Sequence, residues 1–422
     1  MTTNDLGLYI HIPFCAGKCA YCDFLSFAGA DESLVEAYGK ALLQEIAYRG
    51  EAVSGIRASA GESGVREERM GAQAGGSGNG TREKVDYNRF TVDTIFIGGG
   101  TPSLLSADFI KEILAAVRRS FPVKRGAEIT IEANPGTLTA EKLRSYLAAG
   151  INRISLGAQS FDEKLLETLG RRHSADDIVK TAGMMRRLGA DNINLDLMFA
   201  IPGQTPDSWH HTLRQAIALE PAHISFYGLQ IEDNTPLSDR LRQGVVEPVS
   251  DESYVQLYRL AVAALEDAGY EQYEISNAAK KGYACRHNLK YWSIDAYLGL
   301  GLGAHSFWNG KRFSNQTDLV QYNRAATEQP YRAPVASCTE NTVQDDMAEY
   351  LFTGLRKRSG IRLSDFERRF QRPIREVYRK EWPAVERFIG AGLLILDGDA
   401  LKLSLDGIPV SNKILSVFVN DG

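Results

Sequence analysis

The 422-residue sequence contains few cysteines and no long apolar run. Its five cysteines, three of them close together, do not resemble the evenly spread disulfide framework of a secreted protein. No uninterrupted apolar segment approaches the about 18 residues that cross a bilayer. The first residues, MTTNDLG, have neither a positive cluster nor an apolar stretch, so no signal peptide is expected. These absences predict a cytoplasmic protein in a reducing compartment that is not itself a membrane protein.

An excess of positive charge is also missing. Lys and Arg number 48 against 53 Asp and Glu, which gives a formal net charge of −5. Arginines near the C-terminus are interleaved with glutamates, which is typical of a solvated helix face, whereas phosphate binding needs an uncompensated basic stripe. Nucleic acid is therefore not expected as a partner. The interleaved residues are Arg368, Arg369, Arg372, Arg375 and Arg379 with Glu367, Glu376 and Glu381.

Three of the cysteines, Cys15, Cys19 and Cys22, lie in the stretch YIHIPFCAGKCAYCDF with the spacing C-x3-C-x2-C. Thiolates this close together on one loop can converge on a single metal centre, and soft ligands suit zinc or an iron–sulfur cluster. A structural zinc site needs a fourth ligand, which His11 or Asp23 could supply. The preferred interpretation is a [4Fe–4S] cluster with one iron open to an outside ligand. Zinc and unrelated structural cysteines remain as alternatives.

After residue 82 the chain alternates short apolar strands with helical segments of 10–15 residues. This order predicts parallel βαβ units and an α/β fold, a partial (β/α)6 barrel spanning residues 1–235. Functional groups in such a barrel gather where strands end, so the cysteine loop and the polar residues at the strand ends are expected on one rim. The predicted strands are Leu8–Ile12, Val92–Ile97, Glu128–Ala133, Asn152–Gly157, Asn192–Leu197 and His223–Tyr227.

Three further regions complete the predicted organisation. A glycine-rich segment at about 50–82, without aromatic residues, is predicted to be a surface insertion. Residues 236–328 are predicted to extend the barrel. A domain boundary is expected at 329–338. Residues 339–422 follow, with helices and then a hairpin at Leu393–Leu405, and predict a smaller, winged-helix-like domain.

The cysteine loop CAGKCAYC, with Tyr21 before the third cysteine, resembles the cluster loop of the radical S-adenosylmethionine (SAM) superfamily. The resemblance implies that the open iron binds the amino and carboxylate groups of SAM. It also implies that an electron from the cluster cleaves SAM to methionine and a 5′-deoxyadenosyl radical. The protein would then orient the cofactor and exclude water.

Further motifs narrow the resemblance to the subgroup that contains the coproporphyrinogen oxidase HemN and its relative HemW. They are YIHIPFC, GGGTPS, EANPGTL, GAQSF, LGRRH, NLDLM, IPGQT and HNLKYW. Two departures, Ala158 and Ala200, remove no ligand. The SAM contacts that the resemblance implies are Tyr9, Tyr21, Gly99, Gly100, Thr101, Glu132, Gln159, Arg171 and Asp196.

Two features separate HemN from HemW within this subgroup. HemN-type oxidases have a further cysteine two residues after the third, where this chain has Phe24. HemW-type proteins have phenylalanine there and an H-N-x-x-Y-W segment, which matches His287, Asn288, Tyr291 and Trp292. The resemblance therefore implies a heme chaperone that binds heme and delivers it to acceptor proteins, among them membrane-bound respiratory enzymes. The alternative is an oxygen-independent coproporphyrinogen III oxidase, which decarboxylates its substrate through the deoxyadenosyl radical.

His287 has two interpretations at this stage. An imidazole among aromatic residues could be an axial ligand of heme iron or pack against the macrocycle. It could equally be a buried histidine hydrogen-bonded within the core, beside Tyr291 and Trp292. The sequence leaves both open.

Overall fold

The computed structural model describes residues 4–53, 90–328, 331 and 333–419. The predicted insertion at 50–82 lies outside the described residues except for its first four. Those four residues are helical, because helix α1 runs over Glu32–Val53 and so passes the expected start of the insertion.

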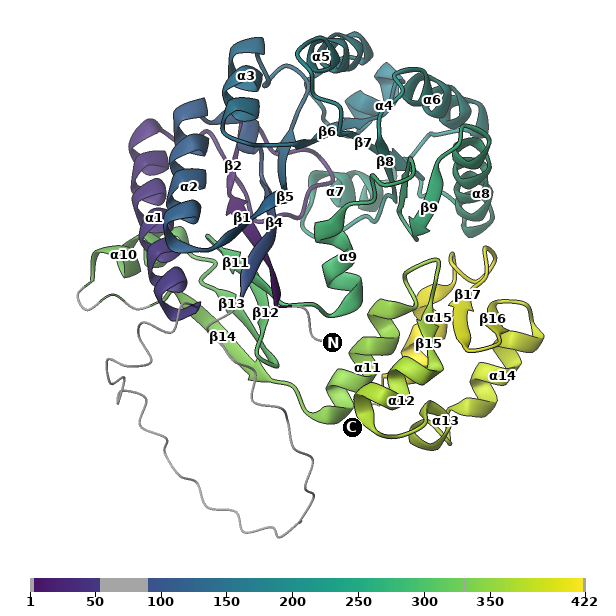
Figure 1. Ribbon diagram of the computed structural model, residues 1–422. Coiled ribbons are helices and arrows are strands. Elements are labelled where there is room, and N and C mark those ends of the chain that lie inside the picture. The colour runs from purple at the N-terminus through teal and green to yellow at the C-terminus, as the bar shows by residue number, and fades with distance from the viewer. Residues whose placement is uncertain (1–3, 54–89, 329–330, 332, 420–422) are drawn as a thin grey trace.

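The described residues form a twelve-stranded sheet whose central strands run parallel in the order β11-β1-β4-β5-β6-β7-β8. Figure 1 shows these strands as a curved sheet with helices along its outer side. The six predicted strands are confirmed, and β11 is a seventh parallel strand that the prediction lacked. The strands are β1 (Asp5–Ile12), β4 (Thr91–Gly99), β5 (Val123–Ala133), β6 (Arg153–Gln159), β7 (Ile193–Phe199), β8 (His223–Gly228) and β11 (Tyr297–Leu300).

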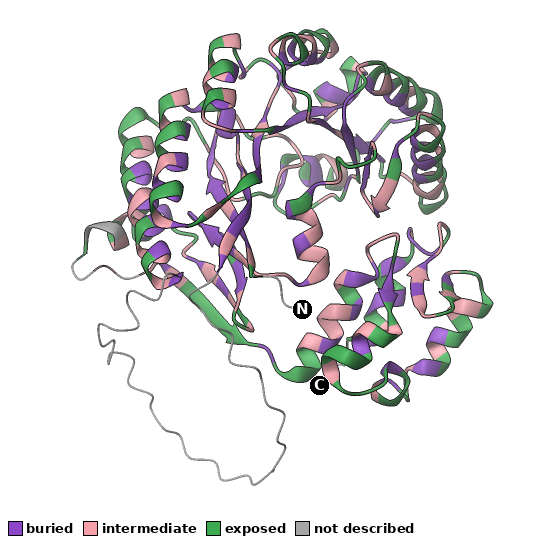
Figure 2. Cartoon of the chain, viewed as in Figure 1, coloured by how far each residue is buried: buried purple, intermediate pink, exposed green. Residues whose placement is uncertain are grey.

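The strands alternate apolar and polar side chains, because one face packs on helices and the other faces the lumen. Leu8, Ile97, Ile131 and Leu195 are fully buried in the layer between strands and helices. Each such side chain contributes about 1.5–3 kcal/mol when it leaves water. The strands are accordingly purple in Figure 2, while the outer faces of the helices are green. These helices include α1, α2 (Ala107–Ser120), α3 (Ala140–Ala148), α4 (Glu163–Thr168), α5 (Ala175–Arg187), α6 (Pro206–Ala218) and α8 (Asp251–Asp267).

The helix starts follow local sequence signals. Ser106 accepts a hydrogen bond from the backbone of Phe109 at the start of α2. Ser174 and Asp177 form a reciprocal capping box at α5. Such caps satisfy N–H groups that have no partner inside the helix, and each stabilises the helix by about 1 kcal/mol. Each helix start, and with it the loop from the preceding strand, is therefore held in one place.

Antiparallel strands extend the sheet at both edges. On the β11 side they are β12 (His305–Trp308), β13 (Lys311–Asn315) and β14 (Val335–Glu340). On the β8 side they are β10 (Asn277–Ala279) and β9 (Glu271–Glu274). The expected domain boundary at 329–338 therefore overlaps β14, and the sheet continues to Glu340. The sequence does not reveal β14, because this edge strand is mostly exposed and lacks an apolar face.

The C-terminal domain follows the predicted order of helices and then a hairpin. Its described strands form a small sheet in the order β15-β17-β16. The spacing of apolar residues predicts one helix over Ile374–Ile389, and this prediction is wrong in one respect, since α13 ends at Val377 and α14 begins at Trp382, just before Pro383. Pro383 has no N–H to donate to a carbonyl in the preceding turn, so it fits the first turn of a new helix and not the interior of a continuous one. The elements are α11 (Val343–Gly354), β15 (Ile361–Arg362), α12 (Leu363–Phe370), α13 (Ile374–Val377), α14 (Trp382–Gly390), β16 (Leu394–Asp397), β17 (Ala400–Leu403) and α15 (Ser411–Leu415).

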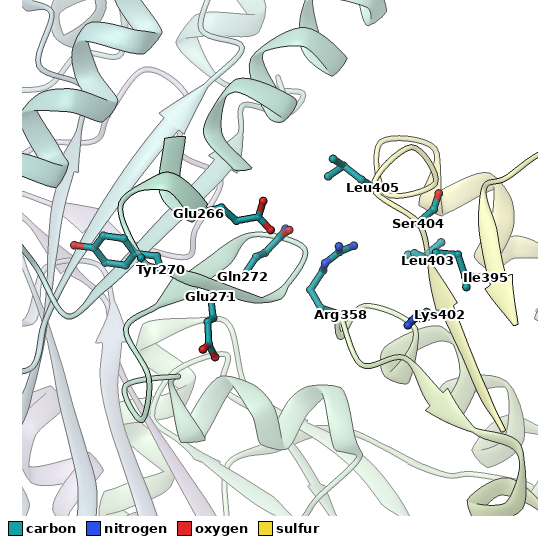
Figure 3. A pocket seen from close by; sticks show the side chains of 11 residues that line it. Glu266, Tyr270, Glu271, Gln272, Arg358, Ile395, Lys402, Leu403, Ser404 and Leu405 are labelled. Atoms are coloured by element: carbon teal, nitrogen blue, oxygen red, sulfur yellow. The ribbon is translucent and has the colours of Figure 1, made fainter. Parts of the chain in front are cut away.

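A pocket of about 660 Å³ lies between the β9 edge of the large sheet and the β16–β17 hairpin (Figure 3). Leu403 and Leu405 line one wall, Tyr270 and Gln272 line the other, and Arg358 lies between them. It contains no cysteine and none of the residues predicted to bind SAM or heme. Among the helices of the described residues, none has the length and apolar character to cross a membrane.

Candidate functional site

The cysteine loop starts where β1 ends and is held by contacts with distant parts of the chain. Two short parallel strands, β2 (Phe14–Cys15) and β3 (Phe27–Ala28), pair at its two ends. In the middle, the Ala20 N–H donates to the Leu169 carbonyl at 2.9 Å, and the Ala20 carbonyl accepts from Leu237 at 2.8 Å. The three cysteines are free and half-buried. The fold therefore holds the loop in place without any disulfide.

His11 belongs to the scaffold of this loop and is not free to bind a metal. Its Nε2 is 2.8 Å from the Leu25 carbonyl, and its Nδ1 is 3.0 Å from the Tyr9 hydroxyl. Burial lowers the pKa of the imidazole. The zinc alternative thus loses one of its two proposed fourth ligands. In the described part of the chain, no three His, Cys, Asp or Glu side chains are arranged as ligands of one metal ion. A [4Fe–4S] cluster does not need three ligands that converge on one ion, since each thiolate binds its own iron.

Two side chains from the barrel reach the cysteine sulfurs. The Thr101 hydroxyl donates to Cys15 Sγ at 3.5 Å, and Arg171 Nη1 donates to Cys19 Sγ at 3.4 Å. Burial raises the pKa of the Cys22 thiol, and the neighbouring Cys19 and Cys15 add to the rise. Donors at sulfur favour the thiolate, which is the form that binds iron. These contacts fit a metal centre on the loop.

The glycines Gly98, Gly99 and Gly100 allow β4 to end directly against the cysteine loop. Gly99 has φ of 110°, and a Cβ there would lie 2.5 Å from the His11 ring. A Cβ at Gly100 would lie 2.7 Å from the Phe14 carbonyl oxygen. Only glycine fits such a conformation with such close contacts. The glycines thus let β4 pack against the cysteine loop, and the N–H groups of Gly99 and Gly100 donate to Glu132 and to the Ile12 carbonyl.

Two carboxyl groups, Glu132 and Asp196, lie half-buried in the barrel, and no ion pair within the described residues compensates either. Burial, with a contribution from Asp196, raises the pKa of Glu132 to about 8. Among the residues that the structure describes, Glu132 accepts one hydrogen bond, from the Gly99 N–H at 3.0 Å. Burial also raises the pKa of Asp196, although Ser155 and Asn194 donate to it at 2.9 and 2.8 Å. A positively charged ligand in the lumen would stabilise both as carboxylates.

The raised pKa of Glu132 predicts a pH dependence of stability. The folded state binds the Glu132 proton more tightly than the unfolded chain does, so this contribution is complete below about pH 4.5 and is lost as pH rises to about 8. We expect the unfolding free energy of ligand-free wild type to fall over this interval relative to Glu132→Gln, by up to about 1.4 kcal/mol per pH unit. Urea unfolding of both proteins at several pH values measures the difference. Parallel curves would contradict it.

Gln159 ends β6 in a strained conformation. Its φ is 66°, in the left-handed region, and a bulge separates it from Gly157 in the pairing with β7. Such a backbone costs of order 1 kcal/mol for a residue other than glycine and occurs often at functional sites. No side-chain hydrogen bond of Gln159 is present within the described residues, so its amide is available to a ligand.

Arg171 combines three partners with one free donor. Its Nη2 donates to Asn134 Oδ1 at 2.7 Å and to the Gly157 carbonyl at 2.6 Å, while Nη1 reaches Cys19. Its buried Nε has no hydrogen-bond partner within the described residues. A pocket of about 270 Å³ is lined by Arg171, Cys19, Thr101 and Asn134. The orphaned donor next to a thiol suits an anionic group such as a carboxylate.

The remaining predicted SAM residues are Tyr9 and Tyr21. Tyr9 lies within β1, opposite Phe96 of β4, and burial raises the pKa of its hydroxyl. Burial is also the main cause that raises the pKa of Tyr21, next to Arg171 and Cys19. Asp196, expected at a strand end, instead lies inside β7, paired with Gly157. The site therefore extends from the rim into the lumen.

His287 lies at the other end of the barrel, near the start of β4. It belongs to helix α9 (Arg286–Ser293) and is buried. Its Nδ1 is 2.8 Å from the Thr94 hydroxyl and its Nε2 is 2.9 Å from the Tyr291 hydroxyl. Burial lowers its pKa to about 3. Both ring nitrogens are engaged, so iron ligation by His287 stays a prediction that requires one of these two bonds to open.

Helix α9 is attached to the barrel by a carboxylate that sequence reasoning missed. Glu128, in β5, accepts hydrogen bonds from the backbone of Arg286 at 3.1 Å and His287 at 3.0 Å. The thiol of Cys285 also points to it, at 3.6 Å. This carboxylate satisfies the N–H groups at the helix start.

Asn134 is a second missed residue, and its place in the EANPG motif directly after a strand could have identified it.

Comparisons with known proteins agree with this geometry. Two family models match the chain: the radical SAM superfamily over residues 81–216 and the HemN C-terminal domain over residues 341–410. Among solved structures, the coproporphyrinogen III oxidase HemN from Escherichia coli has a TM-score of 0.78 and 21% identity, over 98% of this chain and 89% of its own. The fold and the site thus define a radical SAM protein with a HemN-type C-terminal domain.

Curated relatives identify the family within this class. The heme chaperone HemW of Bacillus subtilis is 32% identical over 98% of this chain and 99% of its own length. HemW of Escherichia coli is 41% identical over 71% of this chain and 69% of its own. The mitochondrial radical S-adenosyl methionine domain-containing protein 1 of the mouse is 29% identical over 97% of this chain. The chain belongs to the HemW family.

Proposed function

We propose that this protein is a heme carrier that binds a [4Fe–4S] cluster and SAM and transfers heme to acceptor proteins. The observation that carries the proposal is the match along nearly the whole chain to a relative named as a heme chaperone. The heme-accepting partners, membrane-bound respiratory enzymes among them, belong to the same proposal.

Cys15, Cys19 and Cys22 would hold the cluster. The donors from Thr101 and Arg171 would then meet two of the coordinated sulfurs. Such contacts, together with burial, set how readily an iron–sulfur cluster accepts an electron. When bound, the cluster supplies an open iron and one-electron chemistry.

The residues around the glycine turn suit SAM, which has both a carboxylate and positive charge. The unpaired Nε of Arg171 supports an anionic group at this site, and the carboxyl groups of Glu132 and Asp196 support cationic or hydroxyl groups. Gly99 and Gly100 let the end of β4 lie directly against the cysteine loop. The amide of Gln159 adds a donor and an acceptor.

Replacing Gln159 by glycine tests whether the side-chain amide binds SAM, because the change removes the amide and does not add strain to the left-handed backbone. Glycine relieves the left-handed backbone, so we expect stability to stay within about 1 kcal/mol of wild type. SAM affinity, measured by calorimetry on the cluster-loaded protein, should fall about tenfold, as for one lost hydrogen bond. Ala200→Gly is the matched control, because Ala200 also has a positive φ of 59° but no polar side chain. Equal SAM affinity in both variants would refute the role of the amide.

The proposal is tested by titrating the anaerobically reconstituted protein with heme. We expect a saturable Soret band at about one heme per chain, followed by transfer of that heme to an apo acceptor. Absence of saturable binding would refute the carrier function. His287→Ala tests the predicted iron ligand in the same assay, and an unchanged Soret band in that variant would exclude it.

The second function, oxidative decarboxylation of coproporphyrinogen III, has the structural likeness to HemN as its support. Phe24 opposes it, because it replaces the further cysteine of HemN-type enzymes. Phe24 is 69% exposed on the cluster loop, so it is not there to fill the core. Formation of protoporphyrinogen by cluster-loaded protein with SAM and a reductant would reverse the ranking.

A further inference from the structure

Asn134 lies directly after β5, in a turn that hydrogen bonds hold in place. Its backbone N–H lies 3.3 Å from both the Ser103 and the Thr137 hydroxyl oxygens. Its carbonyl accepts from the Thr137 hydroxyl at 2.8 Å and from the Thr137 N–H at 3.1 Å. The side chain of Asn134 therefore starts from a well-defined position.

The side-chain amide of Asn134 joins the two residues that contact the cysteine sulfurs. Its Nδ2 donates to Thr101 Oγ1 at 3.1 Å, and its Oδ1 accepts from Arg171 Nη2 at 2.7 Å. Thr101 in turn donates to Cys15, and Arg171 donates to Cys19. One amide thus lies at the centre of a network that ends on two thiols.

The directions of the hydrogen bonds in this network require an amide side chain at Asn134. Because Thr101 Oγ1 accepts from Asn134, its single hydrogen remains available to Cys15. Because Oδ1 accepts from Arg171, the guanidinium keeps its Nη1 turned toward Cys19. Aspartate has no donor for Thr101, so the hydroxyl would turn toward the carboxylate and leave Cys15. Alanine would provide neither contact.

From this geometry we infer that Asn134 is a positioning residue that directs Thr101 and Arg171 onto the cluster sulfurs and so raises the reduction potential of the cluster. The inference rests on the proposed cluster at Cys15, Cys19 and Cys22. Hydrogen bonds and positive charge at the sulfurs stabilise the reduced cluster, which has one more negative charge.

The test compares Asn134→Ala, Asn134→Asp and Thr101→Val with wild type in an anaerobic redox titration of the reconstituted protein, followed by electron paramagnetic resonance of the reduced cluster. All three variants should keep the iron and sulfide content of wild type and shift the midpoint to more negative potential. We expect about a tenfold change in the reduction equilibrium for Asn134→Ala, which is about 59 mV for one electron. Asn134→Asp should shift further, because it adds negative charge. Asn412→Ala, exposed in the C-terminal domain, is the control without a shift.

A double variant separates positioning from a general effect on the loop. If Asn134 acts through Thr101, the double variant Asn134→Ala, Thr101→Val shifts the midpoint potential by less than the sum of the two single shifts. An unchanged midpoint in the fully loaded Asn134 variants would overturn the inference. Loss of iron from both Asn134 variants would overturn it too, since Asn134 would then shape the loop itself. Absence of a cluster in wild type would instead refute the proposed function.

Discussion

Replacing Cys19 by alanine is expected to remove iron and sulfide from the anaerobically reconstituted protein, from about four of each per chain to almost none. Two remaining thiolates cannot hold a cubane whose fourth iron is already open. The fold should persist, because Cys19 is half-buried and the loop keeps its contacts through Ala20. Arg171 would lose one acceptor but keep Asn134 and Gly157. Iron and acid-labile sulfide analysis, with thermal unfolding as a check on the fold, measures both effects.

Cys338→Ala is the matched control for this experiment. Cys338 is an exposed, free cysteine on the edge strand β14, and β13, β12 and β11 separate it from β1 and the cysteine loop. Its replacement should leave the iron content unchanged. A Cys19→Ala protein with the iron content of wild type would show that the cluster has other ligands.

Replacing Glu128 by alanine is expected to cause the largest loss of stability, about 2–6 kcal/mol. The change leaves the part-buried N–H of Arg286 and the buried N–H of His287 without an acceptor, at about 1–3 kcal/mol each. That loss is a large part of the about 5–15 kcal/mol by which a protein is normally stable. Urea unfolding measures it, and Glu128→Gln should lose less because its amide oxygen can still accept one bond.

Glu367→Ala serves as the control for Glu128, since Glu367 is exposed on α12. We expect this change to stay within about 0.5 kcal/mol of wild type. A loss below about 1 kcal/mol in Glu128→Ala would mean that water or another group replaces the carboxylate at the start of α9.

The parallel part of the fold could be predicted because strands and helices differ clearly in the spacing of their apolar residues. Strand β11 could not, since its sequence YLGL leads into a glycine-rich turn that has no strand-like pattern. Its glycines serve close packing: a Cβ at Gly299 would lie 2.2 Å from the His305 carbonyl oxygen. Strand β14 pairs with β13 through its backbone and through the Ser314 and Ser337 hydroxyls, and its mostly exposed side chains show no apolar alternation that would indicate a strand.

The candidate site also has features that the sequence predicts and features that it does not. The thiols and the glycine turn could be predicted from their spacing, because both are local. The network around Asn134 could not, since it joins residues from four loops whose distance depends on the complete barrel. The hydrogen bond between the His287 ring and Thr94 could not be predicted either, because Thr94 lies 193 positions away in the sequence.

The position of β1 between two distant strands has a consequence for the order in which the protein forms. β1 pairs with β4 on one side and with β11 on the other, where Gly7 meets Tyr297. The cysteine loop also needs Leu169 and Leu237 for its backbone contacts. Although the cysteines are synthesised first, the partners that shape their loop emerge from the ribosome much later. Such long-range pairing slows folding. Cluster insertion is thus expected to follow synthesis of the whole barrel, with the thiols exposed to solvent until then.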